Sequence, residues 1–374
     1  MHWLSLRIIV LAALGLSIVP SVEPQMITPT KDHPVVEVDV RKFGYEQPNY
    51  QTSVKSFVDF TDNSHIAVAW LTLDGATKKI GPATPWPSHL HVLTIDAVTG
   101  EKTAQKDFAT PHFPVGFAGM RDGHILTLCN NELSLLSPGL DVIRVQDLED
   151  RNEFIKAISP SSHSLLLAFT SGNHKQLTIK DSATFAPLSE WVEEQQTWDI
   201  SDHWIVGSCG NPVKVCVRRF DEFSHPLRPS SLPNQTPAWS RNARAWFVDD
   251  EILVIGGMKR MTVATVNGDV LFEVWSPDGH AFTAPVKSVA GKFAIIEDRR
   301  RGPKSEALDM YFYADDQAVV YSVTEKRAIF AVKLKGESPW APWERHQNQI
   351  ALSPDGGFLA VLSDGILKTY QLPK

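Results

Sequence analysis

The chain repeats one hairpin pattern along its length. In each copy, a short strand of alternating apolar and polar residues runs into a polar turn, and a more continuously apolar strand follows. Such a pattern predicts a β-hairpin, so the chain is expected to consist of repeated β units. Seven copies occupy residues 57–70, 114–129, 154–169, 195–209, 243–257, 284–298 and 349–363, with turns near Asp62, Asp122, Ser161, Asp202, Asp249, Gly291 and Asp355.

The spacing of these turns identifies the repeated unit. The intervals are 60, 39, 41, 47, 42 and 64 residues, and the middle four match the roughly 40–50-residue blades of four-stranded propellers. Two further strands can be placed after the hairpins, for example at 91–97 and 100–108 in the first copy. Apolar residues alternate or form short runs between Gly, Asp, Asn and Pro, which disfavours helices. We therefore predict an all-β fold, a seven-bladed β-propeller of four-stranded antiparallel blades.

The two ends of the chain predict how the ring closes. The seventh copy provides only three strands, the third at 366–372, whereas an unassigned strand lies at 35–40 before the first copy. A strand without a neighbour leaves an unpaired edge, which closed repeat folds avoid. We expect residues 35–40 to form the outer strand of the seventh blade, so that the propeller domain spans 35–374.

The turns carry a resemblance to known propellers. Ser353-Pro354-Asp355-Gly356 and the degenerate Ser159-Pro160-Ser161-Ser162, each followed by an apolar strand, resemble the repeats of WD-repeat-like and YVTN-type seven-bladed propellers of exported bacterial proteins. The resemblance covers about 40–372 as architecture. The Gly-His…Trp-Asp signature of true WD repeats and the Asp-box of sialidases are missing from the repeats. The resemblance therefore implies a fold and does not imply an activity.

The first residues have the layout of an export signal. Arg7 precedes an apolar run at 8–19, and Val19-Pro20-Ser21 places small or medium residues where a signal peptidase cleaves. The run is shorter than the roughly 20 residues needed to span a bilayer, and no later run reaches that length. We predict a signal peptide at 1–21, a linker at 22–34 and a secreted or periplasmic protein without a membrane span; an uncleaved anchor is the alternative.

The charge of the chain argues against nucleic-acid binding. The chain has 36 Lys+Arg against 43 Asp+Glu, a formal net charge of −7. Because binding to phosphates requires a basic surface, a mildly acidic protein is a poor candidate for a nucleic-acid partner.

Insertions indicate which face of the ring could bind a ligand. Loops that join the second and third strands of a blade emerge on the same face as the linkers between blades, and repeat proteins usually bind through such insertions. The first and sixth copies have insertions of this kind, at 73–88 and 299–307, and the linker entering the seventh blade is 338–346. We expect the binding surface to combine these three segments.

Aromatic and charged side chains are dense in these segments. Trp and Arg are favoured at recognition surfaces. Trp has a large rigid ring that packs against a ligand, and the planar guanidinium group of Arg has several N–H hydrogen-bond donors. The alternative is that the two linker tryptophans pack between blades and that the charges are solvated. The candidate residues are Trp86, Trp340, Trp343, Glu344, Arg345 and His346, joined by Tyr45 and Tyr50 if the ring closes as predicted.

A run of three arginines lies in the second insertion. Arg299, Arg300 and Arg301, with Lys304 nearby, form a local positive site on an acidic protein. The run could hold a carboxylate, phosphate or sulfate group. The alternative is that these side chains are simply exposed.

Metal, cofactor and nucleophile motifs are not found. His89 and His91 face the same way on a predicted strand and His112 follows in the next linker, but spacing identifies no further ligands, so we expect no metal site and no cofactor. Residues 207–210 lack the spacing of a Gly-x-Ser-x-Gly nucleophile elbow.

Two of the three cysteines could form a disulfide. Cys209 and Cys216 flank a short turn in the fourth copy, and an oxidising compartment would allow them to pair if the strand register places them opposite each other. Cys129, at the end of an apolar strand, is expected to pack as a small hydrophobic residue.

These observations predict a monomeric, exported propeller that acts as a binding or interaction module for a protein, small-molecule or carbohydrate ligand. The alternative is an exported propeller enzyme, a lactonase-like or other hydrolase or a quinoprotein-like oxidoreductase, with its site at the central channel. Convergent His, Asp, Glu or Arg side chains at the top of the channel would favour the enzyme. An apolar patch lined by Trp would favour binding.

Overall fold

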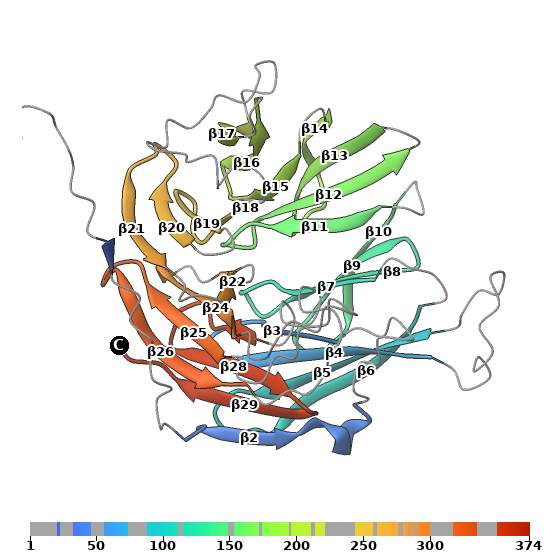
Figure 1. Ribbon diagram of the computed structural model, residues 1–374. Coiled ribbons are helices and arrows are strands. Elements are labelled where there is room, and N and C mark those ends of the chain that lie inside the picture. Colours follow the sequence, from blue (N-terminus) through green and yellow to red (C-terminus); the bar gives the residue numbers. More distant parts are fainter. Residues whose placement is uncertain are drawn as a thin grey trace, which may run out of the picture.

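Seven sheets, whose blade strands are antiparallel, follow one another around a ring in the computed structural model, in the order of the chain (Figure 1). The fold is a seven-bladed β-propeller, as the repeat predicts. The structure describes residues 21–22, 33–45, 56–73, 88–110, 115–148, 153–171, 174–193, 196–210, 214–220, 244–256, 260–275, 280–282, 285–287, 290–299, 317–334 and 350–374.

The first four blades are built from consecutive strands, with the inner strand first. Blade one contains β3 (Ser56–Phe60), β4 (His65–Leu73), β5 (Ser88–Asp96) and β6 (Lys102–Ala109). Blade two contains β7 (Gly116–Gly119), β8 (Ile125–Cys129), β9 (Glu132–Leu136) and β10 (Val142–Asp147). Blade three contains β11 (Phe154–Ile158), β12 (Ser164–Ser171), β13 (His174–Asp181) and β14 (Pro187–Val192). The described part of blade four contains β15 (Thr197–Ile200), β16 (Trp204–Cys209) and β17 (Lys214–Arg219).

The last three blades complete the ring. Blade five contains β18 (Arg244–Phe247), β19 (Ile252–Gly256), β20 (Arg260–Thr265) and β21 (Val270–Trp275). In blade six the inner strand is split into β22 (His280–Phe282) and β23 (Val286–Lys287), which both pair with β24 (Lys292–Arg299), and β25 (Gln317–Ser322) and β26 (Arg327–Lys333) follow. Blade seven contains β27 (Ile350–Leu352), β28 (Phe358–Ser363), β29 (Ile366–Gln371) and, from the other end of the chain, β2 (Val36–Asp39).

The predicted closure of the ring is confirmed. β2 pairs antiparallel with β29 from Val36 opposite Thr369 to Asp39 opposite Ile366, and Figure 1 shows blue β2 beside red β29. The strand is shorter than predicted at its end, because Val40 begins a short 3-10 helix, η1 (Val40–Phe43). The Asp39 carboxylate caps that helix by accepting a hydrogen bond from the Arg41 N–H.

All seven predicted hairpins are present, and each predicted turn residue lies between the first two strands of its blade. Only the first residue of the second predicted insertion, 299–307, belongs to the part that the structure describes. Arg299 still belongs to β24, and residues 300–307 lie outside the described residues. β24 runs one residue further than predicted because Arg299 pairs with His280 of β22.

The hydrophobic core is divided among the joints of the ring. Within the described residues, seven clusters of buried side chains are found, and each joins two successive blades, including blades seven and one. The inner strands of each blade therefore carry apolar residues on both faces. This explains why the second strand of each blade is a continuous apolar run in the sequence. The cluster between blades seven and one contains fully buried Val40 and Trp70.

A two-residue strand from the N-terminal segment lies on the outside of blade five. This strand, β1 (Ser21–Val22), pairs in parallel with β21. Residues 1–20, which hold most of the predicted signal, lie outside the described residues, and the signal stays a prediction. In the part of the chain that the structure describes, no helix has the length and apolar character required to cross a membrane.

Aspartates on inner strands tie successive blades together. Asp59 on blade one accepts a hydrogen bond at 3.0 Å from the backbone N–H of Gly119 on blade two. Asp199 on blade four accepts one at 2.9 Å from the backbone N–H of Phe247 on blade five. Each acceptor lies three residues before its own turn residue, Asp62 or Asp202, so the same position in two repeats makes the same contact.

Asp59 predicts a pH dependence of stability. Burial raises the pKa of Asp59 from 3.8 to about 6, although the charge of Arg121 and two backbone N–H donors lower it in part. The folded protein therefore holds this proton more tightly than the unfolded chain, and the stabilising effect is lost as pH rises from about 4 to about 6. Relative to D59N, the free energy of unfolding should fall by about 3 kcal/mol over that range. Urea unfolding of both proteins at pH 4, 5, 6 and 7 measures this difference, and a constant difference would contradict the assignment.

Candidate functional site

Strand direction places the ends of several strands on one face of the ring, here called the loop face. Neighbouring strands of a blade run in opposite directions, so its second and fourth strands end on the same face. On this face β4 ends at Leu73, β24 at Arg299, β26 at Lys333 and β28 at Ser363. The two predicted insertions and the linker into blade seven therefore start from the loop face.

The residues predicted to bind on this face are not themselves described. Trp86, Arg300, Arg301, Trp340, Trp343, Glu344, Arg345 and His346 lie outside the described residues, as does Tyr50. Arg299 is the last residue of β24, and only its backbone is described. The recognition-patch and arginine-site hypotheses stay predictions.

Tyr45 does not fit the predicted surface patch. Its side chain is only 7% exposed and its ring lies edge-on to buried Trp70, with 5.7 Å between ring centroids. The closure of the ring instead brings Tyr45 into the core between blades seven and one.

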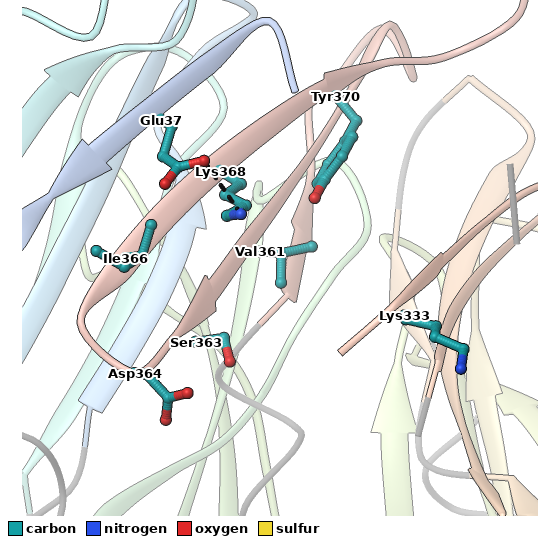
Figure 2. A pocket seen from close by; sticks show the side chains of 8 residues that line it. All are labelled: Glu37, Lys333, Val361, Ser363, Asp364, Ile366, Lys368 and Tyr370. Atoms are coloured by element: carbon teal, nitrogen blue, oxygen red, sulfur yellow. Dashed lines mark ion pairs between the residues drawn. The ribbon is translucent and has the colours of Figure 1, made fainter. Parts of the chain in front are cut away.

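A cavity of about 310 Å³ opens between blades six and seven toward the loop face. Figure 2 shows side chains from β28, β29 and β2 on one wall and Lys333 of β26 on the neighbouring sheet. Lys333 is the last residue of β26 and stands five residues before Ser338, where the predicted binding linker begins. The lining residues are Glu37, Lys333, Val361, Ser363, Asp364, Ile366, Lys368 and Tyr370.

The alternation of side chains along β29 shapes this wall. Ile366, Lys368 and Tyr370 point to the cavity, whereas Leu367 packs into the core with blade one and the Thr369 hydroxyl donates to the Ala97 carbonyl at 2.8 Å. The same strand therefore presents Ile366, Lys368 and Tyr370 toward blade six, and Leu367 and Thr369 toward blade one.

The cavity has an apolar floor and a charged rim. Val361 is 4% and Tyr370 6% exposed, and both belong to the core between blades six and seven. Glu37 pairs with Lys368 at 3.1 Å. Burial raises the pKa of Tyr370, and the negative charge of Glu37 adds to that effect, so the phenol is held as a neutral hydrogen-bond donor.

The rim combines cations with hydroxyl-binding groups. Lys333 and Lys368 provide ammonium groups on two sides, and Ser363 and Asp364 lie at the turn between β28 and β29. Ammonium groups bind carboxylates as point charges, while carboxylates and hydroxyls exchange hydrogen bonds with alcohols. The rim thus offers two ammonium groups, two carboxylates and a hydroxyl to a small polar ligand.

The histidines of blade one lie on one face of the sheet, as predicted. The rings of His89 and His91 have centroids 6.3 Å apart, and His112 lies outside the described residues. Over the described ranges, no group of three His, Cys, Asp or Glu side chains is arranged to hold a metal ion.

Cys209 and Cys216 form a disulfide in the structure. Their register differs from the predicted one: Cys209 is opposite Lys214 and Cys216 is opposite Gly207, so the cysteines are diagonal neighbours. Their Cα atoms are 5.9 Å apart, within the usual range for disulfides. Cys129 packs against the core between blades one and two, and burial raises the pKa of its thiol to about 12.

Comparison with known proteins supports the fold. No protein-family model matches the sequence, and no curated protein matches it. The WD40 domain of Neurospora crassa Pan2 is 10% identical, with a TM-score of 0.51 over 91% of this chain and 95% of that domain. The chain shares the fold of that WD40 domain. A chain of the mitotic checkpoint complex (14% identity, TM-score 0.49, covering 94% and 98%) and BamB from Moraxella catarrhalis (12%, 0.40, 84% and 84%) are also similar.

Sequence reasoning missed the cavity. Its lining residues come from both ends of the chain and from two blades, so no local motif joins them. One signal was available in the sequence. The strand at 366–372 carries Lys368 between Ile366 and Tyr370 on one face, although a strand inside a propeller blade is expected to be apolar on both faces.

Proposed function

We propose that the protein is an exported binding module whose ligand occupies the cavity between blades six and seven. The observation that carries this proposal is the position of the cavity on the loop face, where Lys333 at the end of β26 lines it. The N-terminal run after Arg7 supports export. The propeller fold, shared with WD40 domains, supports a binding role, because propellers present loops from several blades on one rigid face.

The chemistry of the lining favours a sugar acid as ligand. A carboxylate of the ligand would lie between Lys333 and Lys368, and its hydroxyls would meet Ser363 and Asp364. Val361 and the Tyr370 ring would contact the carbon skeleton of the sugar. A cavity near 310 Å³ is at the lower end of small-molecule sites, which span roughly 300–1,000 Å³, so a monosaccharide is the expected size.

Binding of glucuronate tests the proposal. We expect glucuronate to raise the melting temperature of the protein and to bind at least about tenfold more tightly than glucose, because only glucuronate has the carboxylate for the lysines. K333A should weaken glucuronate binding about tenfold, and Y370F, which keeps the ring and removes the hydroxyl, by a factor of about five. Calorimetric titration measures the dissociation constants.

K214A is the matched control, since Lys214 is an exposed lysine at the start of β17 on blade four. It should leave glucuronate binding unchanged. Equal affinity of the parent and K333A for glucuronate, or equal binding of glucuronate and glucose, would contradict the assignment of the site.

A further inference from the structure

Thr72, His91 and Asp107 form a hydrogen-bonded chain across three strands of blade one. The Thr72 Oγ1 atom lies 2.7 Å from His91 Nε2, and His91 Nδ1 lies 2.7 Å from Asp107 Oδ1. Thr72 is near the end of β4, His91 near the start of β5 and Asp107 near the end of β6, so all three lie at the loop face. They stand on the side of blade one that packs against blade seven, whereas the cavity lies on the opposite side of blade seven.

The partners of His91 determine where its protons are. An ionised carboxylate only accepts hydrogen bonds, so Nδ1 of His91 must carry the proton that Asp107 binds. Neutral imidazole then has its lone pair at Nε2, and the Thr72 hydroxyl must donate its proton to that atom. This is the polarity in which a histidine acts as general base toward a hydroxyl nucleophile.

The ring of His91 is held in this orientation. It stacks on Trp70, with 5.2 Å between ring centroids and an angle of 20° between planes, and Trp70 is fully buried. The side chain of His91 is 19% exposed and that of Asp107 57%, so solvent and small molecules reach the chain of hydrogen bonds. Thr72 is half-buried, and as a β-branched residue it has restricted rotation at χ1.

We propose that Thr72, His91 and Asp107 form a second site, which hydrolyses carboxylic esters. Thr72 Oγ1 attacks the acyl carbon while its proton passes to His91 Nε2. The tetrahedral intermediate then expels the alcohol of the ester, which leaves with that proton, and an acyl-threonine ester remains. Water next gives a proton to Nε2 and attacks the acyl carbon; the carboxylic acid is released and Thr72 recovers its proton from His91.

The nucleophile defines the substrate class. A threonine hydroxyl is secondary and reacts slowly, so the site requires an ester with a good leaving group, one derived from an acidic alcohol. Aryl esters of short carboxylic acids meet this condition and are small enough to approach a half-buried hydroxyl. Asp107 is a positioning residue, because it acts on the substrate only through His91.

Hydrolysis of p-nitrophenyl acetate tests the proposal in the full-length protein. T72V and H91Q should each lower kcat/KM about 100-fold, and the double variant should be no slower than either single variant, because the two residues act as a unit. T72S keeps the hydroxyl and should stay within about tenfold of the parent. D107N should lower kcat and leave KM unchanged, since it disturbs the tautomer of His91 rather than substrate contacts.

H203Q is the matched control, because His203 also pairs with a carboxylate, Asp250, at 2.7 Å, but lies at a turn on the opposite face of the ring. It should hydrolyse the ester at the parent rate. Hydrolysis by T72V at the parent rate would overturn the proposal. If T72V does not fold, mass spectrometry of the parent after brief exposure to the ester decides: acetyl-Thr72 supports the site, and an unmodified Thr72 during turnover overturns it.

Discussion

Deletion of residues 35–40 is expected to destabilise the whole ring and not only one blade. The deletion removes β2, and with it the backbone pairing to β29 from Val36 to Asp39. It also removes Val40, which is fully buried between blades seven and one. Because the deletion leaves β29 as an unpaired edge and opens the core between blades seven and one, we expect a loss of at least about 5 kcal/mol, or failure to fold.

Thermal denaturation followed by circular dichroism measures this effect. The melting temperature of the deletion variant should fall by at least about 10 °C. V40A is a milder variant of the same joint and should cost about 2 kcal/mol through the cavity that it leaves. V35A is its matched control, since Val35 is 46% exposed and outside the strand. A deletion variant that melts like the parent would show that blade seven is closed by some other strand.

Substitution of Gly119 by alanine is the second change with a large expected effect. Gly119 ends the inner strand β7, and its backbone lies directly against the backbone of Phe60 on blade one. A Cβ atom at this position would overlap the Phe60 carbonyl, lying 2.7 Å from its carbon atom. The Gly119 N–H also donates to Asp59, so the strand cannot move away without losing that bond. We expect G119A to cost at least about 3 kcal/mol.

Urea denaturation compares G119A with the parent and with G139A. Gly139 is an exposed turn residue, and a Cβ there would come no closer than 3.7 Å to the Ser137 hydroxyl, so G139A should change stability by less than about 0.5 kcal/mol. Equal stability of G119A and G139A would mean that the inner strands of blades one and two are further apart than described.

The fold could be predicted from the sequence because its signals are local. Each hairpin is encoded by a polar turn, such as Asp62 or Asp355, between two short strands, and the regular spacing of the turns indicates a ring. The closure could also be predicted, since a strand without a partner at 35–40 matched a blade with one strand missing.

The sites could not be predicted in the same way. The cavity is lined by both Glu37 and Lys333 because the ring closes with β2, and their spacing along the chain does not indicate that they share a cavity. The hydrogen-bonded chain of blade one depends on strand register. His91 is directly opposite Asp107, but Thr72 reaches it diagonally from the position opposite His89. The sequence indicated the pair His89 and His91. It did not indicate that the Thr72 hydroxyl and the Asp107 carboxylate are the hydrogen-bond partners that orient the His91 ring.

Amide chemical shifts of the ¹⁵N-labelled protein during titration with glucuronate test the proposed function most directly. We expect the largest changes at Ser363, Asp364, Ile366 and Lys368, which line the cavity on β28 and β29, and at Lys333 across from them. These changes should be absent with glucose at the same concentration. Saturable shifts confined to other blades, with these five amides unmoved, would contradict the proposal that the cavity between blades six and seven is the binding site.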